Sequence, residues 1–337
     1  MATLMFQTLP SLIQESHGKK EWFVPANQGQ PHVDGLILDT HFMGMTPMND
    51  VESRHSFEYT CSFSKYYTRL TVCSCVTISG LASHPFGSWQ PKRSDKTFMW
   101  IRDTLPKHLP GVRSIIYGYD TKLGGSQSFQ LIPDLAQALI NQLQTYGWNS
   151  ASAKPVVFLA HSLGGLVLRE ALVKLDRSPD EGYTALLSLF AGAVFFGVPN
   201  LGMEQSHFQT IVDDNPNETL VDDIARGSNY LRRLNDSSSN SSFQSRFKCF
   251  WAYETSQSPT ILVSQPSKWK FISNTKQKNA DGTIDRNGTP AILVSRESAT
   301  CKFNEKNPSI TFPINETHSD MVKFTRDSPD YHDVVHK

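Results

Sequence analysis

The 337-residue chain has no surplus of either charge, since 32 Lys and Arg residues balance 32 Asp and Glu residues. Proteins that bind nucleic acid through its phosphates, or that bind an anionic membrane surface, usually carry a basic excess. The charge balance therefore argues against nucleic acid as a partner. Hydrophobic residues make up 39% of the chain and charged residues 19%, which is typical of a globular protein.

Cysteine is sparse, and its spacing excludes two common roles. The five cysteines are scattered along the chain: Cys61, Cys73, Cys75, Cys249 and Cys301. Their odd number and wide separation do not form a disulfide framework. No Cys-x-x-Cys pair and no Cys/His cluster has the spacing of a zinc site, so the sequence predicts no metal.

The sequence predicts neither a membrane-spanning segment nor an export signal. The longest apolar segment, residues 185–198, is shorter than the ~20 residues that a helix needs to cross a bilayer. The first twenty residues lack a basic region followed by a continuous apolar stretch, so they make a poor signal peptide. We expect a cytoplasmic protein without a transmembrane segment, and a peripheral membrane contact stays open.

From about residue 70 onward, strand-like runs alternate with helical periodicity. The predicted strands are 70–79, 112–120, 155–160, 192–199, 246–254, 291–298 and 309–314, and the predicted helices are 96–109, 132–147 and 166–175. Such alternation predicts an α/β domain with a mostly parallel sheet and helices on both faces. We expect this domain to span 70–337, with a partly irregular N-terminal extension over 1–69 and a polar helical cap or insertion over 203–245.

The stretch FLAHSLGGLVLRE (158–170) places a serine between a buried strand-like run and a helical pattern. Ala160 and Gly164, two positions before and after Ser162, are small enough to let the backbone turn sharply without a Cβ clash. The first N–H groups of the helix would point toward the serine, where negative charge develops. The pattern is typical of the nucleophile turn of an α/β-hydrolase; the alternative is an ordinary Ser-Leu-Gly-Gly turn.

A nucleophilic serine needs a base, which in this fold follows it along the chain. Of the histidines after Ser162, His207 lies in the polar insertion, and His332 and His336 lie in a charged tail. His318 directly follows the last strand-like run, where a sheet of this kind builds its site. The sequence therefore predicts His318 as the base.

Two glutamates have the right chain order for the acid that orients this base. Glu254 ends the strand-like run FKCFWAYE, and Glu297 ends AILVSRE. We favour Glu254 and keep Glu297 as the alternative. For the oxyanion hole we predict the backbone N–H of Leu163, which follows the nucleophile, and that of Leu81 in the loop after the strand at 70–79.

Several motifs in a fixed order are similar to one family. The ordered set GLASHPFGSW, WIRDTLPKHLPGVRSIIYGYDT, FLAHSLGGLVLREAL, FFGVPNLG, YET, SRESA and HSDMVKF, over about residues 76–335, resembles the serine-esterase domain of the SERAC1/PGAP1-like lipase group, of the fungal type. The resemblance implies an α/β-hydrolase fold, Ser162 as nucleophile, His318 as base, and action on carboxylic esters, including lipid-derived ones, without a cofactor.

The sequence departs from the family pattern at two places. Ser79 replaces the first histidine of H-G-L-G-G-H, residues 82–84 (ASH) replace its G-G-H, and Asn200 stands where a histidine is usual. The first departure changes the loop expected to hold Leu81. The hypotheses are therefore a serine esterase acting through an acyl-enzyme, with thioesterase or acyltransferase chemistry as variants, or a weak or inactive hydrolase module that serves in interaction or signalling.

Overall fold

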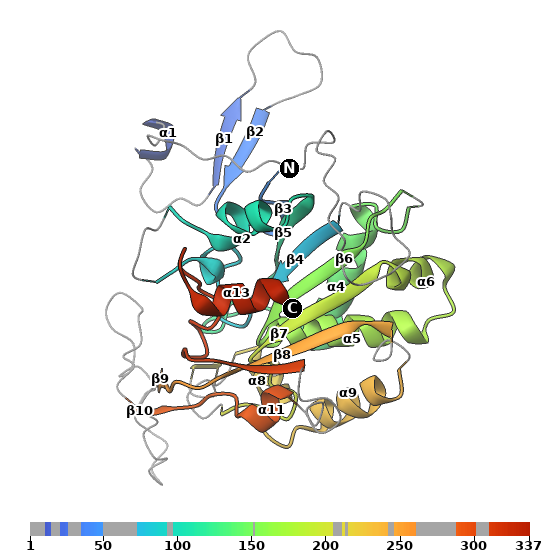
Figure 1. Cartoon of the computed structure of the whole chain (residues 1–337), viewed down its shortest axis with the longest axis vertical. Coiled ribbons are helices and arrows are strands. Elements are labelled where there is room, and N and C mark those ends of the chain that lie inside the picture. The colour runs from blue at the N-terminus through green and yellow to red at the C-terminus, as the bar shows by residue number, and fades with distance from the viewer. Residues whose placement is uncertain are drawn as a thin grey trace.

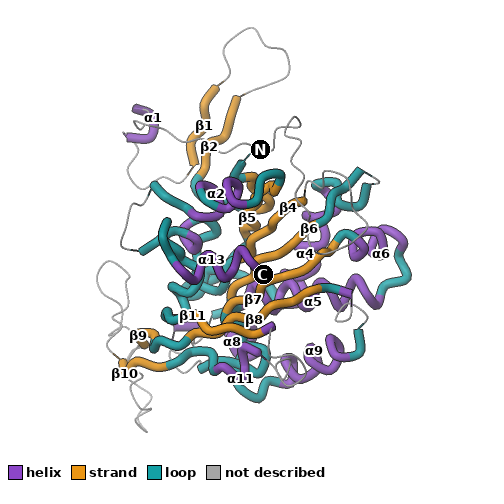
Figure 2. Tube along the Cα trace, in the orientation of Figure 1, coloured by secondary structure: helices purple, strands orange, loops and turns teal. Residues whose placement is uncertain are grey.

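The computed structural model describes residues 11–14, 21–25, 35–49, 73–92, 97–150, 152–204, 211–212, 215–241, 246–260, 288–300 and 310–337. Its centre is a seven-stranded sheet between two layers of helices (Figure 1). Figure 2 shows the strands running side by side through the molecule, with helices in front of and behind them.

The central sheet has the strand order β11-β8-β7-β6-β4-β5-β3. Its strands are β3 (Gly44–Pro47), β4 (Cys73–Ile78), β5 (Val112–Gly118), β6 (Val156–His161), β7 (Phe190–Phe196), β8 (Lys248–Glu254) and β11 (Thr311–Ile314). Every neighbouring pair is parallel except β3 with β5, which is antiparallel. Two further antiparallel pairs are β1 (Glu21–Pro25) with β2 (Gly35–Asp39), and β9 (Ser258–Thr260) with β10 (Gly288–Ala291).

Helices cover both faces of the sheet and enclose two hydrophobic cores. On one face lie α4 (Ile132–Thr145), α5 (Leu163–Arg177), α6 (Glu181–Ser188), α8 (Glu218–Asp223), α9 (Asn229–Ser239) and α11 (Arg296–Thr300). On the other lie the short helices η1 (Gly87–Trp89), α2 (Trp100–Asp103) and α3 (Leu105–His108), together with α13 (Pro329–His336). The one-turn helix α1 (Ser11–Gln14) precedes β1.

Local sequence patterns account for the elements that carry the site. β6 is apolar from Val156 to Ala160 because both of its faces are covered, as in other parallel sheets. α4 buries residues at helical spacing, and its Asp134 side chain accepts the N–H of Leu131 to cap the first turn. α5 buries all of its first seven residues because its start is wedged between the sheet and the surrounding helices.

The predicted fold class is confirmed. The predicted helix 96–109 forms two short helices, α2 and α3, and the strands differ from the prediction in two further places. β3 lies inside the predicted N-terminal extension, yet it forms the antiparallel edge of the central sheet. The predicted strand 291–298 is wrong beyond Ala291, because residues 296–300 form α11. The N–H groups of Leu293 and Val294 donate to a carboxylate, not to a neighbouring strand, which explains why the apolar run does not extend the sheet.

The predicted insertion over 203–245 contributes two described helices to a helix layer. α9 packs beside α5, and the Tyr230 hydroxyl donates to Glu170 of α5 (Figure 1). Leu220 of α8 and Leu234 of α9 belong to the core on that face. Among the described residues, no helix combines the length and apolar character needed to cross a membrane.

Candidate active site

The turn between β6 and α5, residues 160–165, is called the elbow. Ser162 adopts φ 50° and ψ −124°, a backbone conformation that side-chain-bearing residues rarely occupy. Its N–H donates to the carbonyl of Phe196 at 2.9 Å, which ties the elbow to β7. A Cβ on Gly164 would lie 2.5 Å from the carbonyl oxygen of Ser79, so only glycine fits there. The sequence pattern thus produces a strained turn that presents Ser162.

Residues 79–84, called the Gly80 loop, follow β4 and lie against the elbow. β4 and β6 are parallel neighbours, with Ile78 opposite Ala160, so both turns leave the same edge of the sheet. A Cβ on Gly80 would lie 2.8 Å from the Cβ of Ser162. The absence of a side chain at Gly80 therefore lets the backbone approach the serine closely.

Three side chains from distant parts of the sequence form one hydrogen-bonded series. His318 Nε2 lies 3.0 Å from Ser162 Oγ, and His318 Nδ1 lies 2.5 Å from Glu254 Oε2. All three residues are buried, with at most 6% of their surface exposed. Ser162 directly follows β6, Glu254 ends β8, and His318 follows β11, so the series is built at the carboxyl ends of parallel strands.

The hydrogen bonds assign the tautomer of His318. A carboxylate only accepts, so Nδ1 carries the proton and donates to Glu254. Nε2 then has a free lone pair, which can accept the hydroxyl proton of Ser162. The other oxygen of Glu254, Oε1, accepts the N–H groups of Leu293 at 2.7 Å and Val294 at 3.2 Å. The carboxylate is therefore held from both sides.

The backbone of His318 is also fixed on both sides. Its N–H donates to Ser258 Oγ at 3.1 Å, and its carbonyl accepts from His161 Nε2 at 2.8 Å. Gly197, at φ 52°, lies so close that an added Cβ would be 3.0 Å from the His318 ring. His161 adjoins Ser162, yet sequence reasoning gave no role to it or to Ser258. Ser258 has no sequence signal, and the contact from His161 joins residues 157 positions apart.

The remaining predicted site residues fall in different places. Glu297 is exposed on the first turn of α11, and it is Glu254 that contacts His318. Leu163 is the first residue of α5, so its N–H has no acceptor within the helix. Leu81 directly follows Gly80 and is partly buried. It packs against the core on the α4–α5 face of the sheet and against a small cluster of Leu123, Val212 and Val221.

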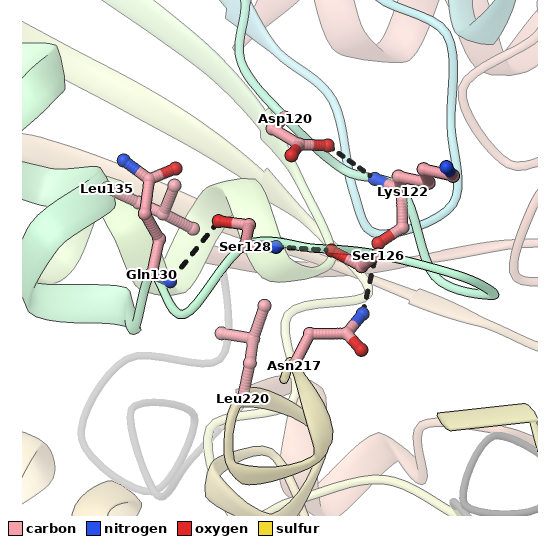
Figure 3. A pocket seen from close by; sticks show the side chains of 8 residues that line it. All are labelled: Asp120, Lys122, Ser126, Ser128, Gln130, Leu135, Asn217 and Leu220. Atoms are coloured by element: carbon pink, nitrogen blue, oxygen red, sulfur yellow. Dashed lines mark hydrogen bonds between the residues drawn. The ribbon is translucent and has the colours of Figure 1, made fainter. Parts of the chain in front are cut away.

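A separate small hollow lies beside the chain that connects β5 to α4 (Figure 3). Asn217 Nδ2 donates to the carbonyls of Lys122 and Leu123 at 3.0 and 2.9 Å and so holds the segment before α8 against this connection. The cavity volume is about 10 Å³, which accommodates about one water molecule. It is lined by Asp120, Lys122, Ser126, Ser128, Gln130, Leu135, Asn217 and Leu220. Since none of these belongs to the Ser162 series, the hollow is not part of that site.

Strand order and site together define the class of fold. The sheet is parallel except for its antiparallel edge strand β3, and a strained serine lies at the turn between β6 and α5. The acid is the last residue of β8 and the histidine follows β11, which gives the chain order serine, acid, histidine. This is the arrangement of the α/β-hydrolase fold.

Proteins of known sequence are related to part of this chain. No family model matches the chain. The chain is 26% identical over 199 residues to SERAC1 of Danio rerio, and the match covers 53% of this chain and 30% of that protein. It is 24% identical over 149 residues to SERAC1 of Homo sapiens, covering 39% and 22%. The chain is thus a distant homologue of SERAC1 over about half of its length, and the aligned part spans less than a third of these relatives.

Solved structures of lipases are also similar to this chain. The mature lipase BlEst2 of Bacillus licheniformis shares 14% identity at a TM-score of 0.46, covering 86% of this chain and 97% of the lipase. Lipase 1 of Pelosinus fermentans shares 12% identity at a TM-score of 0.45, covering 79% and 98%.

Proposed function

We propose that the protein is a serine hydrolase that cleaves carboxylic esters through an acyl-enzyme intermediate. The observation that carries this proposal is the series Ser162–His318–Glu254, whose atoms lie 3.0 and 2.5 Å apart at the carboxyl edge of the sheet. A hydroxyl, an imidazole with a free lone pair and a carboxylate in this order make a nucleophile with its base and its orienting acid.

The reaction starts with attack on the ester carbonyl. Ser162 Oγ forms a bond to the carbonyl carbon while His318 Nε2 takes the hydroxyl proton, and the carbonyl π electrons move to the oxygen. When the tetrahedral intermediate collapses, the bond to the alcohol oxygen breaks, and His318 gives its proton to that oxygen. Water then attacks the acyl-serine by the same route and releases the acid. Glu254 orients His318 and stabilises its positive charge in both halves.

The negative oxygen of each tetrahedral intermediate needs hydrogen-bond donors in fixed positions. The N–H of Leu163 is suited to this role because it begins α5 beside the nucleophile. The N–H of Leu81 is the second donor in this proposal, because Gly80 brings the Gly80 loop against Ser162. Removing one such donor by mutation lowers turnover about 10²–10³-fold in other serine hydrolases.

A series of p-nitrophenyl esters with acyl chains from short to long tests the proposal and measures the chain preference. We expect release of p-nitrophenol by the wild-type protein and a loss of about five to six orders of magnitude in Ser162→Ala. The family resemblance is the reason for including long, lipid-like chains. A folded wild-type protein that hydrolyses none of the esters would overturn the proposal and favour an interaction or signalling module.

The two candidate glutamates provide a matched pair of variants. Glu254→Gln removes the negative charge beside His318, and we expect turnover to fall by about two to four orders of magnitude. Glu297→Gln makes the same chemical change on the exposed first turn of α11 and should leave turnover unchanged. Equal losses in the two variants would contradict the assignment of the acid.

A further inference from the structure

The imidazole of His161 lies beside that of His318 and contacts its backbone. The two ring centroids are 5.0 Å apart, with an angle of 39° between the ring planes. His161 Nε2 is 2.8 Å from the carbonyl oxygen of His318. Because a carbonyl only accepts, Nε2 of His161 carries the proton and donates. The side chain therefore joins the residue before the nucleophile directly to the main chain of the base.

The surroundings of the remaining nitrogen of His161 favour a neutral ring. Nδ1 is buried and has no hydrogen-bond partner within the described part of the chain. A protonated imidazole would need an acceptor at Nδ1, so this environment disfavours the charged form. Burial, with a contribution from the nearby His318, lowers the pKa of His161 to about 3. His161 thus stays uncharged when His318 becomes an imidazolium.

We propose that His161 is a positioning residue, whose Nε2–H holds the main chain of His318 so that the base stays aligned with Ser162 Oγ. This inference rests on the proposed function, in which His318 removes the Ser162 proton. His161 and Ser162 are adjacent in sequence, so one hydrogen bond fixes the distance between the strained elbow and the loop after β11. The Ser258 hydroxyl fixes the other side of the same residue at its N–H.

Positioning of this kind affects rate strongly because proton transfer depends on distance. A displacement of about 1 Å between reacting groups can cost 10²-fold. The Ser162 Oγ to His318 Nε2 distance of 3.0 Å is already suited to proton transfer. Loss of the His161 bond frees the carbonyl of His318 and allows the imidazole to move relative to the serine.

Three variants at position 161 separate the donor from the ring. In His161→Gln the amide nitrogen is as many bonds from Cβ as Nε2 is, so the donor is kept. His161→Asn places its amide at the level of Nδ1, and His161→Phe keeps a ring without a donor. We expect fluorophosphonate labelling of Ser162 to be within about threefold of wild type in the Gln variant. It should fall about 10- to 100-fold in the Asn and Phe variants.

A second readout is independent of activity. The Nδ1 proton of His318, held by Glu254, should give a low-field proton NMR signal. We expect this signal to weaken and to change its chemical shift in the Asn and Phe variants, and to match that of wild type in the Gln variant. If all folded variants keep the wild-type labelling rate and NMR signal, the inference is wrong. If wild type itself is not labelled, the proposed function fails, and the NMR comparison alone decides the inference.

Discussion

The elbow and the Gly80 loop leave the same edge of the sheet and touch each other, but different forces hold them in place. In the elbow, close packing fixes the backbone: a Cβ on Gly164 would meet the carbonyls of Ser79 and Ile78 at 2.5 and 2.7 Å. In the Gly80 loop, hydrogen bonds to the segment after β5 do this work. The Tyr119 hydroxyl donates to the Ser79 carbonyl at 2.7 Å, and the Ala82 N–H donates to the Thr121 carbonyl at 2.8 Å.

Each region also contains one strained residue, and the strain is of different origin. Ser162 has φ 50° in a turn whose neighbouring positions are small, as its sequence pattern requires. Ala82 has φ 53° and stands at a glycine position of the H-G-L-G-G-H pattern that residues 79–84 resemble. The elbow therefore keeps the residues that its geometry demands, whereas the Gly80 loop accepts a strained alanine and compensates with hydrogen bonds. We expect the elbow to tolerate no added volume and the loop to depend on individual donors.

Adding one methyl group to the elbow should have the largest effect. In Gly164→Ala the new Cβ meets backbone atoms, which cannot move aside as a side chain can. We expect a loss of about 3 kcal/mol or more in the free energy of unfolding, measured by chemical denaturation. Gly87→Ala is the matched control, because its Cβ would make an ordinary contact of 3.6 Å with His84. Similar losses in both variants would refute the packing account of the elbow.

Acid should destabilise the protein partly through the elbow residue His161. Its pKa is about 3 in the folded protein and about 6.5 in the unfolded chain. As the pH falls from 6.5 toward 3, the unfolded chain takes up a proton that the folded protein does not, so stability decreases. Above pH 6.5 both states are neutral at this group, and it causes no pH dependence.

The His161→Gln variant isolates this contribution, since glutamine does not titrate. We expect its free energy of unfolding to fall less steeply than that of wild type between pH 6.5 and 4. Parallel curves over that range, measured by urea denaturation at each pH, would show that His161 titrates normally in the folded protein.

Removing one hydroxyl from the support of the Gly80 loop should have an intermediate effect. Tyr119→Phe deletes the donor to the carbonyl of Ser79, a residue that is 1% exposed. An unsatisfied buried acceptor costs about 1–3 kcal/mol, which we expect as the loss in unfolding free energy. Tyr146→Phe, on an exposed side chain, should change stability by less than about 0.5 kcal/mol. A neutral Tyr119→Phe variant would mean that the loop does not depend on this bond.

Relieving the strain at Ala82 should give the smallest change, and in the opposite direction. Glycine adopts φ 53° without a Cβ penalty, so Ala82→Gly should raise the free energy of unfolding by about 0.5–1 kcal/mol. Ala185→Gly, at an exposed position within α6, should instead lower it by about 0.5–1 kcal/mol. If the two variants change stability by the same amount and sign, Ala82 is not strained.

Local sequence patterns predicted the elbow well because its geometry depends on neighbouring residues. An apolar run, small residues around Ser162 and a helical repeat are enough to indicate the turn. The same patterns favour Glu254 but leave Glu297 open as the alternative acid, since both glutamates come at the end of apolar runs. Contacts remote in sequence separate them: the N–H groups of Leu293 and Val294 bond to Glu254 and end the expected strand before Glu297.

Three other features could not be predicted from local sequence patterns, because each depends on contacts between residues that are far apart in the chain. β3 is only four residues long and contains Pro47, so its pairing with β5 leaves no periodic signal. The N–H of Ala82 donates to the carbonyl of Thr121, which belongs to the segment after β5 and is remote from Ala82 in sequence. The contact of His161 with His318 likewise exists only after β6 and β11 have joined one sheet.

Site-mapped labelling by a fluorophosphonate tests directly whether Ser162 is an activated nucleophile, because the reagent reacts with an activated serine. We expect one covalent adduct, located by peptide mass spectrometry on Ser162, with none formed in Ser162→Ala. His318→Gln should slow the labelling by several orders of magnitude while the protein stays folded. An unlabelled wild-type protein, or an adduct that persists in Ser162→Ala, would show that Ser162 is not the nucleophile.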